Sequence, residues 1–185
     1  LTVSNDLTVR GTAYASEFKK IDGSSLSNLI DEFADNWSQL GINLDVIAGE
    51  RAGESIALSS DGTIVAVGAR YHDSNKGTAR VYQWNGSGWS QLLGGIDLDG
   101  KAGDQAGRSV ALSGDGTIVA VGAPNHDNDK GTACVYQWNG SSWTQLGNEG
   151  DLDGETDDKA GQSIALSSDG TIVAVGAPSL DNGTD

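Results

Sequence analysis

Two acidic loops of the chain carry the residue types and the spacing that proteins use to bind calcium. Each loop has two aspartates separated by one residue, then a glycine, and then at least one further aspartate. Calcium takes roughly six to eight oxygen ligands, and known calcium loops supply many of them as alternating carboxylates around a glycine. The candidate metal ligands are Asp97, Asp99, Asp104, Asp151, Asp153 and Asp157.

The competing interpretation is that these loops are solvated acidic turns. The corresponding segment nearer the N-terminus, 43–46 (NLDV), is shorter by two residues, and neither acidic loop has the glutamate that closes an EF-hand loop. We therefore favour solvated acidic turns and expect no cofactor; a calcium site, if the chain has one, lies in these two loops.

Three serines stand in a Gly-x-Ser-x-Ala pattern that comes close to the nucleophile elbow of hydrolases. These are Ser55, Ser109 and Ser163. The elbow needs a strand-to-helix turn and a small final residue, whereas here each serine begins a predicted strand and recurs in every copy of a repeat. The two histidines, His72 and His126, occupy the same position of the first two copies, and the third copy has Leu180 there. We therefore predict no catalytic residue.

The elements that must position the acidic loops come from a repeated unit. Three nearly identical phrases, beginning at Gly53, Gly107 and Gly161, are 54 residues apart. A period of this kind indicates that one supersecondary unit is copied, and that each copy buries its apolar face against the next. The repeated positions that we single out as structural are Gly53, Gly107, Gly161, Asp61, Asp115, Asp169, Trp84 and Trp138.

Asp-Gly and Asn-Gly turns between alternating apolar residues divide each copy into strands. In the second copy the pattern predicts strands at 89–93, 108–113, 117–123 and 132–138, with equivalents 54 residues either way. Four antiparallel strands in about 50 residues describe a propeller blade. The sequence predicts an all-β fold of tandem four-stranded antiparallel blades in a partial β-propeller. The repeats span 37–88, 89–142 and an incomplete 143–185.

At these residues the chain resembles a known family. The segments AGRSVALSGDGTIVAVGAP and KGTACVYQW are similar to the FG-GAP repeats of integrin α-subunit propellers, over residues 37–185. Many family members carry an Asp-x-Asp-x-Asp-Gly calcium loop between the first two of these strands. This chain has a four-residue turn there, which argues against calcium at Asp61, Asp115 and Asp169. The phrases also look like tryptophan-aspartate repeats, but the Gly-His and Trp-Asp pairs that characterise those repeats are missing from this chain.

Residues 1–36 form a leader outside the repeat array. Its near-repeat LTVSND and LTVRGT resembles the β-rich stems of viral or phage fibre proteins. Ser25 precedes apolar residues spaced i, i+3, i+4 and i+7, so we predict a capped helix at 25–35. The leader either covers the first edge of the array or forms an oligomerising stalk.

Composition restricts the partners. The net charge of −15, from 26 acidic and 11 basic residues, opposes binding to nucleic acid or to an anionic membrane surface. No run approaches the roughly 18 apolar residues of a membrane span. Cys134 is the only cysteine and aligns with Arg80, so neither a disulfide nor a metal site is implied. Four sequons, at Asn36, Asn85, Asn139 and Asn182, are glycosylation acceptors or hairpin turns.

Propellers close with about four to eight blades, whereas this chain supplies three copies and contains no methionine. We interpret it as a fragment whose exposed edges are covered by the remaining blades of a parent chain or by an oligomer partner.

Two functions remain. We expect a non-catalytic propeller, extracellular or on a particle surface, that recognises a protein or glycan ligand. The alternative is a propeller hydrolase, such as a glycosidase that uses acidic loop residues as paired carboxylates. A catalytic site breaks the repeat with residues found in one blade only, and these copies are nearly interchangeable, which favours binding.

Overall fold

The computed structural model describes residues 39–44, 48–92, 98–147 and 152–179. From Leu40 onward these residues belong to one compact unit, Leu40–Asp185. The predicted leader at 1–36 and its helix at 25–35 lie outside the described residues. Within the described ranges, no helix has the length and apolar character needed to cross a lipid bilayer.

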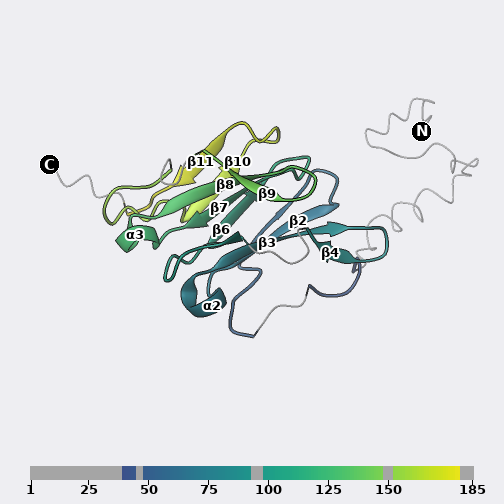
Figure 1. The fold of residues 1–185 in the computed structure, drawn as a ribbon, viewed down its shortest axis with the longest axis horizontal. Coiled ribbons are helices and arrows are strands. Elements are labelled where there is room, and N and C mark those ends of the chain that lie inside the picture. Colours follow the sequence, from purple (N-terminus) through teal and green to yellow (C-terminus); the bar gives the residue numbers. More distant parts are fainter. Residues whose placement is uncertain (1–38, 45–47, 93–97, 148–151, 180–185) are drawn as a thin grey trace, which may run out of the picture. The chain divides into compact units, whose positions relative to one another are not determined.

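The described residues form tandem antiparallel sheets (Figure 1). The first sheet has the order β1-β2-β3-β4, with β5 paired to β3, the second has the order β6-β7-β8-β9, and the third contains β10 and β11. The predicted fold class is confirmed, because four-stranded antiparallel sheets of this order fit the blades of a partial propeller. The strands are β1 (Ser55–Leu58), β2 (Ile64–Ala69), β3 (Thr78–Trp84), β4 (Trp89–Gln91), β5 (Leu98–Asp99), β6 (Ser109–Leu112), β7 (Ile118–Ala123), β8 (Thr132–Trp138), β9 (Trp143–Leu146), β10 (Ser163–Leu166) and β11 (Val173–Gly176).

The positions of the strands follow the sequence pattern closely. β8 spans the predicted 132–138, and β6 and β7 lie within the predicted 108–113 and 117–123. The β-branched run of β7 is a central strand, in which Val119 and Ala120 are fully buried. Alternating apolar residues and tight turns thus determine the strands locally.

The predicted order of the strands needs one correction. The strand at 89–93 was expected to begin the next blade, but Trp89–Gln91 pairs with Thr78–Trp84 as the fourth strand of the first sheet. The reason is the short turn between them, in which Asn85 Oδ1 accepts hydrogen bonds from Ser87 N and Gly88 N at 3.0 and 2.9 Å. So tight a hairpin joins neighbouring antiparallel strands and cannot cross to another sheet.

The expectation that the repeats contain no helix is wrong. One-turn segments, α2 (His72–Asn75) and α3 (His126–Asp129), follow β2 and β7. Their backbone is left-handed, with φ of 42° at Asp73, 57° at Ser74 and 69° at Asn75. Asp, Asn and Ser tolerate this region better than other non-glycine residues. A single left-handed turn produces no 3.6-residue apolar period, so the sequence pattern does not reveal it.

Tryptophan pairs face each other across the β3-β4 and β8-β9 hairpins, as the sequence predicts. Trp84 and Trp89 are partners in register, and their ring centroids are 5.5 Å apart with an interplanar angle of 58°. Trp138 and Trp143 repeat the arrangement at 5.4 Å and 48°. All four rings are half-buried. Each pair therefore stabilises the outer hairpin of its sheet through a tilted aromatic contact.

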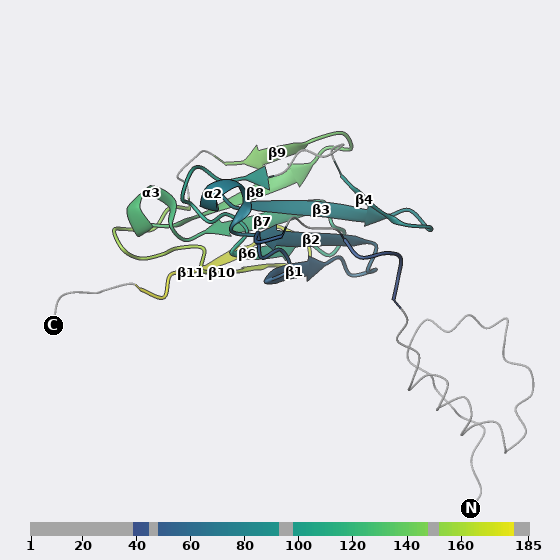
Figure 2. The ribbon, with the colours of Figure 1, turned by 90° about the horizontal axis from the view of Figure 1, so that it is seen from below.

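The hydrophobic core lies between the first and second sheets. It combines small and β-branched residues of β2 and β3, such as Ala66 and Val81, with Val110 and Leu112 of β6 and Val121 of β7. β6 packs against β1 on one side and β10 on the other, so the first strands of the three sheets are neighbours (Figure 2). This is the relation expected of the inner strands of successive propeller blades.

Candidate functional site

A pocket of about 200 Å³ opens where β5 and the loop after it meet the second sheet. The face of β8 contributes Thr132, Cys134 and Tyr136, which alternate along the strand and so point to the same side. The remaining functional groups are carboxylates, an imidazole and an amide. They belong to Asp99, Asp104, His126, Gln145 and Asp153.

The imidazole in this pocket is held by a buried carboxylate. Asp104, 7% exposed, places Oδ2 at 2.9 Å from His126 Nδ1, and the same oxygen accepts a hydrogen bond from Lys101 N at 2.9 Å. The carbonyl oxygen of Asp104 also accepts from Asn125 N at 3.2 Å. Asp104 therefore fixes its own loop and orients His126, rather than standing free as a ligand.

The first copy carries an equivalent cluster with one difference. Glu50 Oε1 lies 2.5 Å from His72 Nδ1, and Oε2 accepts from Arg80 Nη1 at 3.0 Å. Burial by itself raises the pKa of Glu50, but the hydrogen bonds from His72 and Arg80 outweigh it and lower that pKa. Arg80 is the counterpart of Cys134. The second copy thus has a thiol where the first has a guanidinium bound to the buried acid.

A buried acid occurs in every copy, and sequence reasoning missed this series. In the third copy it is Asp158, 6% exposed, whose Oδ2 accepts from Glu155 N at 2.8 Å. The signal was present, because Glu50, Asp104 and Asp158 each stand three residues before the repeated glycine. The sequence pattern instead predicts Asp157, with Asp151 and Asp153, as the ligands of this loop. Asp157 is exposed with a φ of 67°, at a position equivalent to a glycine.

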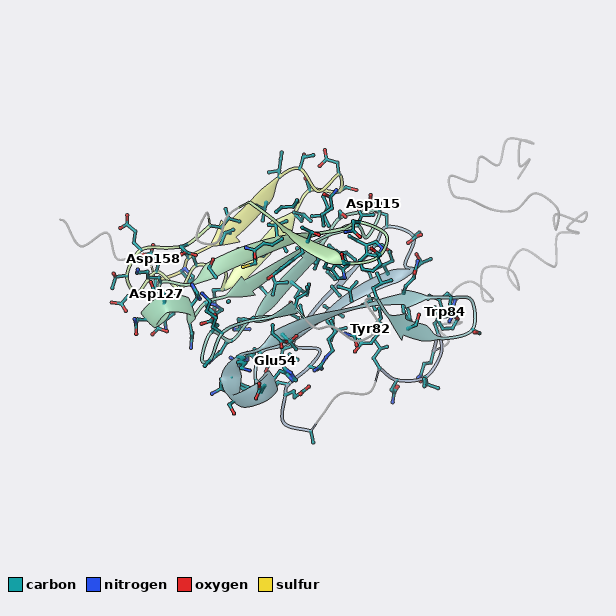
Figure 3. All side chains as sticks on the ribbon, in the orientation of Figure 1. Glu54, Tyr82, Trp84, Asp115, Asp127 and Asp158 are labelled. Carbon is teal, nitrogen blue, oxygen red and sulfur yellow. The ribbon has the colours of Figure 1, made fainter. Side chains whose placement is uncertain are left out.

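The structure brings together three of the predicted calcium ligands, whereas Asp157 does not line the same pocket. Asp99 and Asp153 are exposed side chains that line the pocket with Asp104, although they come from the two loops predicted as separate sites. Asp97 and Asp151 lie outside the described residues. Asp158 lies beside α3, together with Asp127, at the end of the sheets opposite Asp115 (Figure 3).

The residues that the structure describes contain no group of three or more His, Cys, Asp or Glu placed to hold a metal ion. The candidate ligand sets are incomplete here without Asp97 and Asp151, so the choice between calcium sites and solvated acidic turns stays untested.

The aspartates of the short Asp-Gly turns have their oxygens engaged within the turn. Asp169 Oδ1 accepts hydrogen bonds from Ser167 Oγ at 2.6 Å, Thr171 N at 3.1 Å and Thr171 Oγ1 at 2.9 Å. The bond from Ser167, followed by those from Thr171, lowers the pKa of Asp169 to about 2. The equivalent serine and threonine of their own turns lower the pKa of Asp61 and Asp115. These carboxylates stabilise the β-turn between the first two strands of each sheet, a structural role.

Two further groups define the pocket's chemistry. Burial raises the pKa of the Tyr136 phenol, and the neighbouring Cys134 acts in the same direction, so the hydroxyl stays neutral. Gln145 Nε2 lies 3.9 Å from Cys134 Sγ. With Asp99 and Asp153 as acceptors, the pocket can receive hydrogen bonds from a ligand's hydroxyl or ammonium groups.

Comparison with known proteins identifies the repeat. Residues 89–136 match the FG-GAP repeat family, which covers β4 to β8 and most of the pocket lining. The resemblance predicted from the sequence is thereby confirmed for this copy. The match describes a repeat module. A search of curated proteins found no match.

Proposed function

We propose that this chain is a non-catalytic recognition module that acts outside the cell or on a particle surface, and that it binds a protein or glycan ligand in the pocket of Asp99, Asp104 and Asp153. The observation that carries the proposal is the convergence of two exposed carboxylates, from Asp99 and Asp153, on one concave site beside the Asp104–His126 pair. The FG-GAP repeat at 89–136 supports a binding module rather than an enzyme.

The size and charge of the pocket indicate the ligand chemistry. Its volume of about 200 Å³ is below the roughly 300–1,000 Å³ of pockets for drug-sized molecules. It therefore suits one sugar residue or one side chain of a protein partner. Carboxylates accept hydrogen bonds from sugar hydroxyls and pair with Lys or Arg. The net charge of −15 would also steer a basic partner toward the chain.

A propeller hydrolase is the competing proposal, since Asp99 and Asp153 are two exposed carboxylates at one pocket. Glycosidases need such a pair at a defined separation, one acid to protonate the leaving group and one to act as base or nucleophile. Against it, the buried acid Asp104 has counterparts in Glu50 and Asp158. Asp99 and Asp153 also share one repeat position, which Asp45 occupies in the first copy, whereas a catalytic site breaks the repeat with residues found in one blade only.

Binding of the full chain to an array of glycans and of Lys- and Arg-rich peptides tests the proposal. Asp99→Asn and Asp153→Asn should each weaken binding of the best probe at least tenfold. Asp157→Asn is the matched control, because it removes the same charge from an exposed position that does not line the pocket. Equal losses in all three variants would reduce the effect to net charge and refute the site. Turnover of aryl glycosides would instead favour the hydrolase.

A further inference from the structure

The inner strands of the three sheets differ in which of their faces is exposed. In β1, Ile56 and Leu58 are 62% and 57% exposed, whereas the alternate residues are half-buried. All four residues of β6 are buried. In β10 the pattern is reversed, with Ser163 and Ala165 exposed and the alternate residues half-buried. The middle strand is therefore covered on both faces, and each end strand is open on the opposite face.

The covered faces show what fits against what. Val110 and Leu112 of β6 belong to the same core cluster as first-sheet residues, and Ala57 of β1 packs on it. The interface thus joins the Ser-Ala face of one inner strand to the apolar face of the next. By position, Ile56 and Leu58 are the counterparts of Val110 and Leu112. They are one half of an interface whose other half is the Ser-Ala face of β10.

Isoleucines and glycines interlock at each sheet boundary in the same way. A Cβ added at Gly116 would meet Ile64 of the first sheet, and one added at Gly170 would meet Ile118 of the second sheet. Each isoleucine therefore lies over the turn glycine of the following copy. Backbone hydrogen bonds repeat as well, since Ser60 N donates to Gly114 O at 2.8 Å.

The third isoleucine and the first turn glycine have no counterpart within the described part of the chain. Ile172 is 68% exposed, and a Cβ added at Gly62 would meet nothing within 4 Å. The backbone series also continues, because Gly114 N donates to Ser168 O at 2.7 Å. The next link would run from Ser168 N to the carbonyl oxygen of Ser60 in another copy.

We propose that a second copy of this chain docks head to tail on these faces. The leading face comprises Ile56, Leu58 and Gly62, and the trailing face comprises Ser163, Ala165 and Ile172. The trailing face of one chain takes the leading face of its partner with the contacts that already join the sheets within one chain. Heterologous contacts of this kind close into a ring when the rotation allows. Two chains joined at both pairs of faces leave neither a leading nor a trailing face open.

Sedimentation velocity of the full chain over a concentration series tests the proposal. The wild type should sediment as a two-chain species rather than at the single-chain mass of 19.0 kDa. Leu58→Glu, on the leading face, and Ala165→Glu, on the trailing face, should each abolish this species. Thr144→Glu on β9 adds the same charge at an exposed position away from both faces and should leave it intact. Thermal unfolding confirms that each variant is folded, and Ile56→Asp and Ile172→Asp repeat the test.

Mixing the two defective variants gives the decisive result. The Leu58→Glu chain keeps its trailing face and the Ala165→Glu chain keeps its leading face, so an equimolar mixture should recover a two-chain species that neither variant forms alone. A single-chain wild type, as expected if residues 1–36 covered the leading face, overturns the proposal. A mixture that stays single-chain, or assembly that survives both substitutions, overturns it too.

Discussion

Trp138→Ala tests whether the tryptophan pairs hold the outer hairpins. A tryptophan side chain contributes roughly 150–250 Å² when enclosed, and two-thirds of the lower figure, about 100 Å², is a minimum for the mostly covered ring of Trp138. At about 25 cal/mol per Å² this corresponds to about 2.5 kcal/mol. The tilted contact with Trp143, at 5.4 Å between centroids, adds about 0.5–1.5 kcal/mol. We expect the free energy of unfolding to fall by about 3 kcal/mol, the lower end for a tryptophan-to-alanine change.

Thermal unfolding followed by circular dichroism measures this loss. For a domain of 150–250 residues, 1 kcal/mol shifts the midpoint by about 2–4 °C, so the expected fall is about 6–12 °C. Thr144→Ala, at an exposed position of the same strand, should stay within about 0.5 kcal/mol of the wild type. An unchanged midpoint for Trp138→Ala would show that the ring contributes nothing to the hairpin.

A double-mutant cycle with Trp143→Ala then isolates the contact between the two rings. The coupling energy should be about 0.5–1.5 kcal/mol. If Trp138→Ala costs the same with Trp143 present or absent, burial alone accounts for its effect and the reasoning about the pair is refuted.

Three further predictions concern metal, packing and pH. Calcium and an equal ionic strength of sodium chloride should stabilise the chain alike through screening; a calcium-specific rise in melting temperature, lost in Asp99→Ala but kept in Asp115→Ala, would contradict this. Gly116→Ala should lower stability by at least about 1 kcal/mol more than Gly62→Ala, because both glycines have φ near 70° but only Gly116 contacts an isoleucine of the neighbouring sheet; equal losses in urea unfolding would contradict the interlocking. The pKa of Asp169 is about 2 against an ordinary 3.8, so the stability that this carboxylate contributes is complete above pH 3.8 and is lost as the pH falls toward 2. Asp169→Asn should flatten the pH dependence of stability in that window. An unchanged pH profile of the melting temperature would contradict this prediction.

Several features of the repeat follow from the sequence because they depend on residues that are close together along the chain. β8 lies where alternation and turn residues predict it, and the tryptophan pair across the β8-β9 turn was expected from the hairpin alone. The role of Asp169 also follows from sequence, because its donors Ser167 and Thr171 are two residues away. These features depend on contacts between chain neighbours, which a sequence pattern encodes directly.

The candidate site could be predicted only in part. Asp99, Asp104 and Asp153 were singled out for their type and spacing, yet as two separate metal loops. Their convergence on one pocket depends on the packing of β5 and the second sheet, which joins segments about 50 residues apart. The calcium-loop pattern favours Asp157 over its neighbour Asp158, whereas the repeat register, in which Glu50 and Asp104 are the counterparts of Asp158, identifies the buried carboxylate.

The sequence by itself determined the repeat, the strands and the hairpins of this chain, since periodicity and turn chemistry act over a few residues. Only the tertiary structure decided that Trp89–Gln91 completes the preceding sheet, that α2 and α3 are left-handed turns, and that β1 and β10 are open on opposite faces. The physical reason is that nearly identical copies have identical local preferences. Their burial differs only because the middle copy has a neighbour on both sides and each outer copy has a neighbour on one.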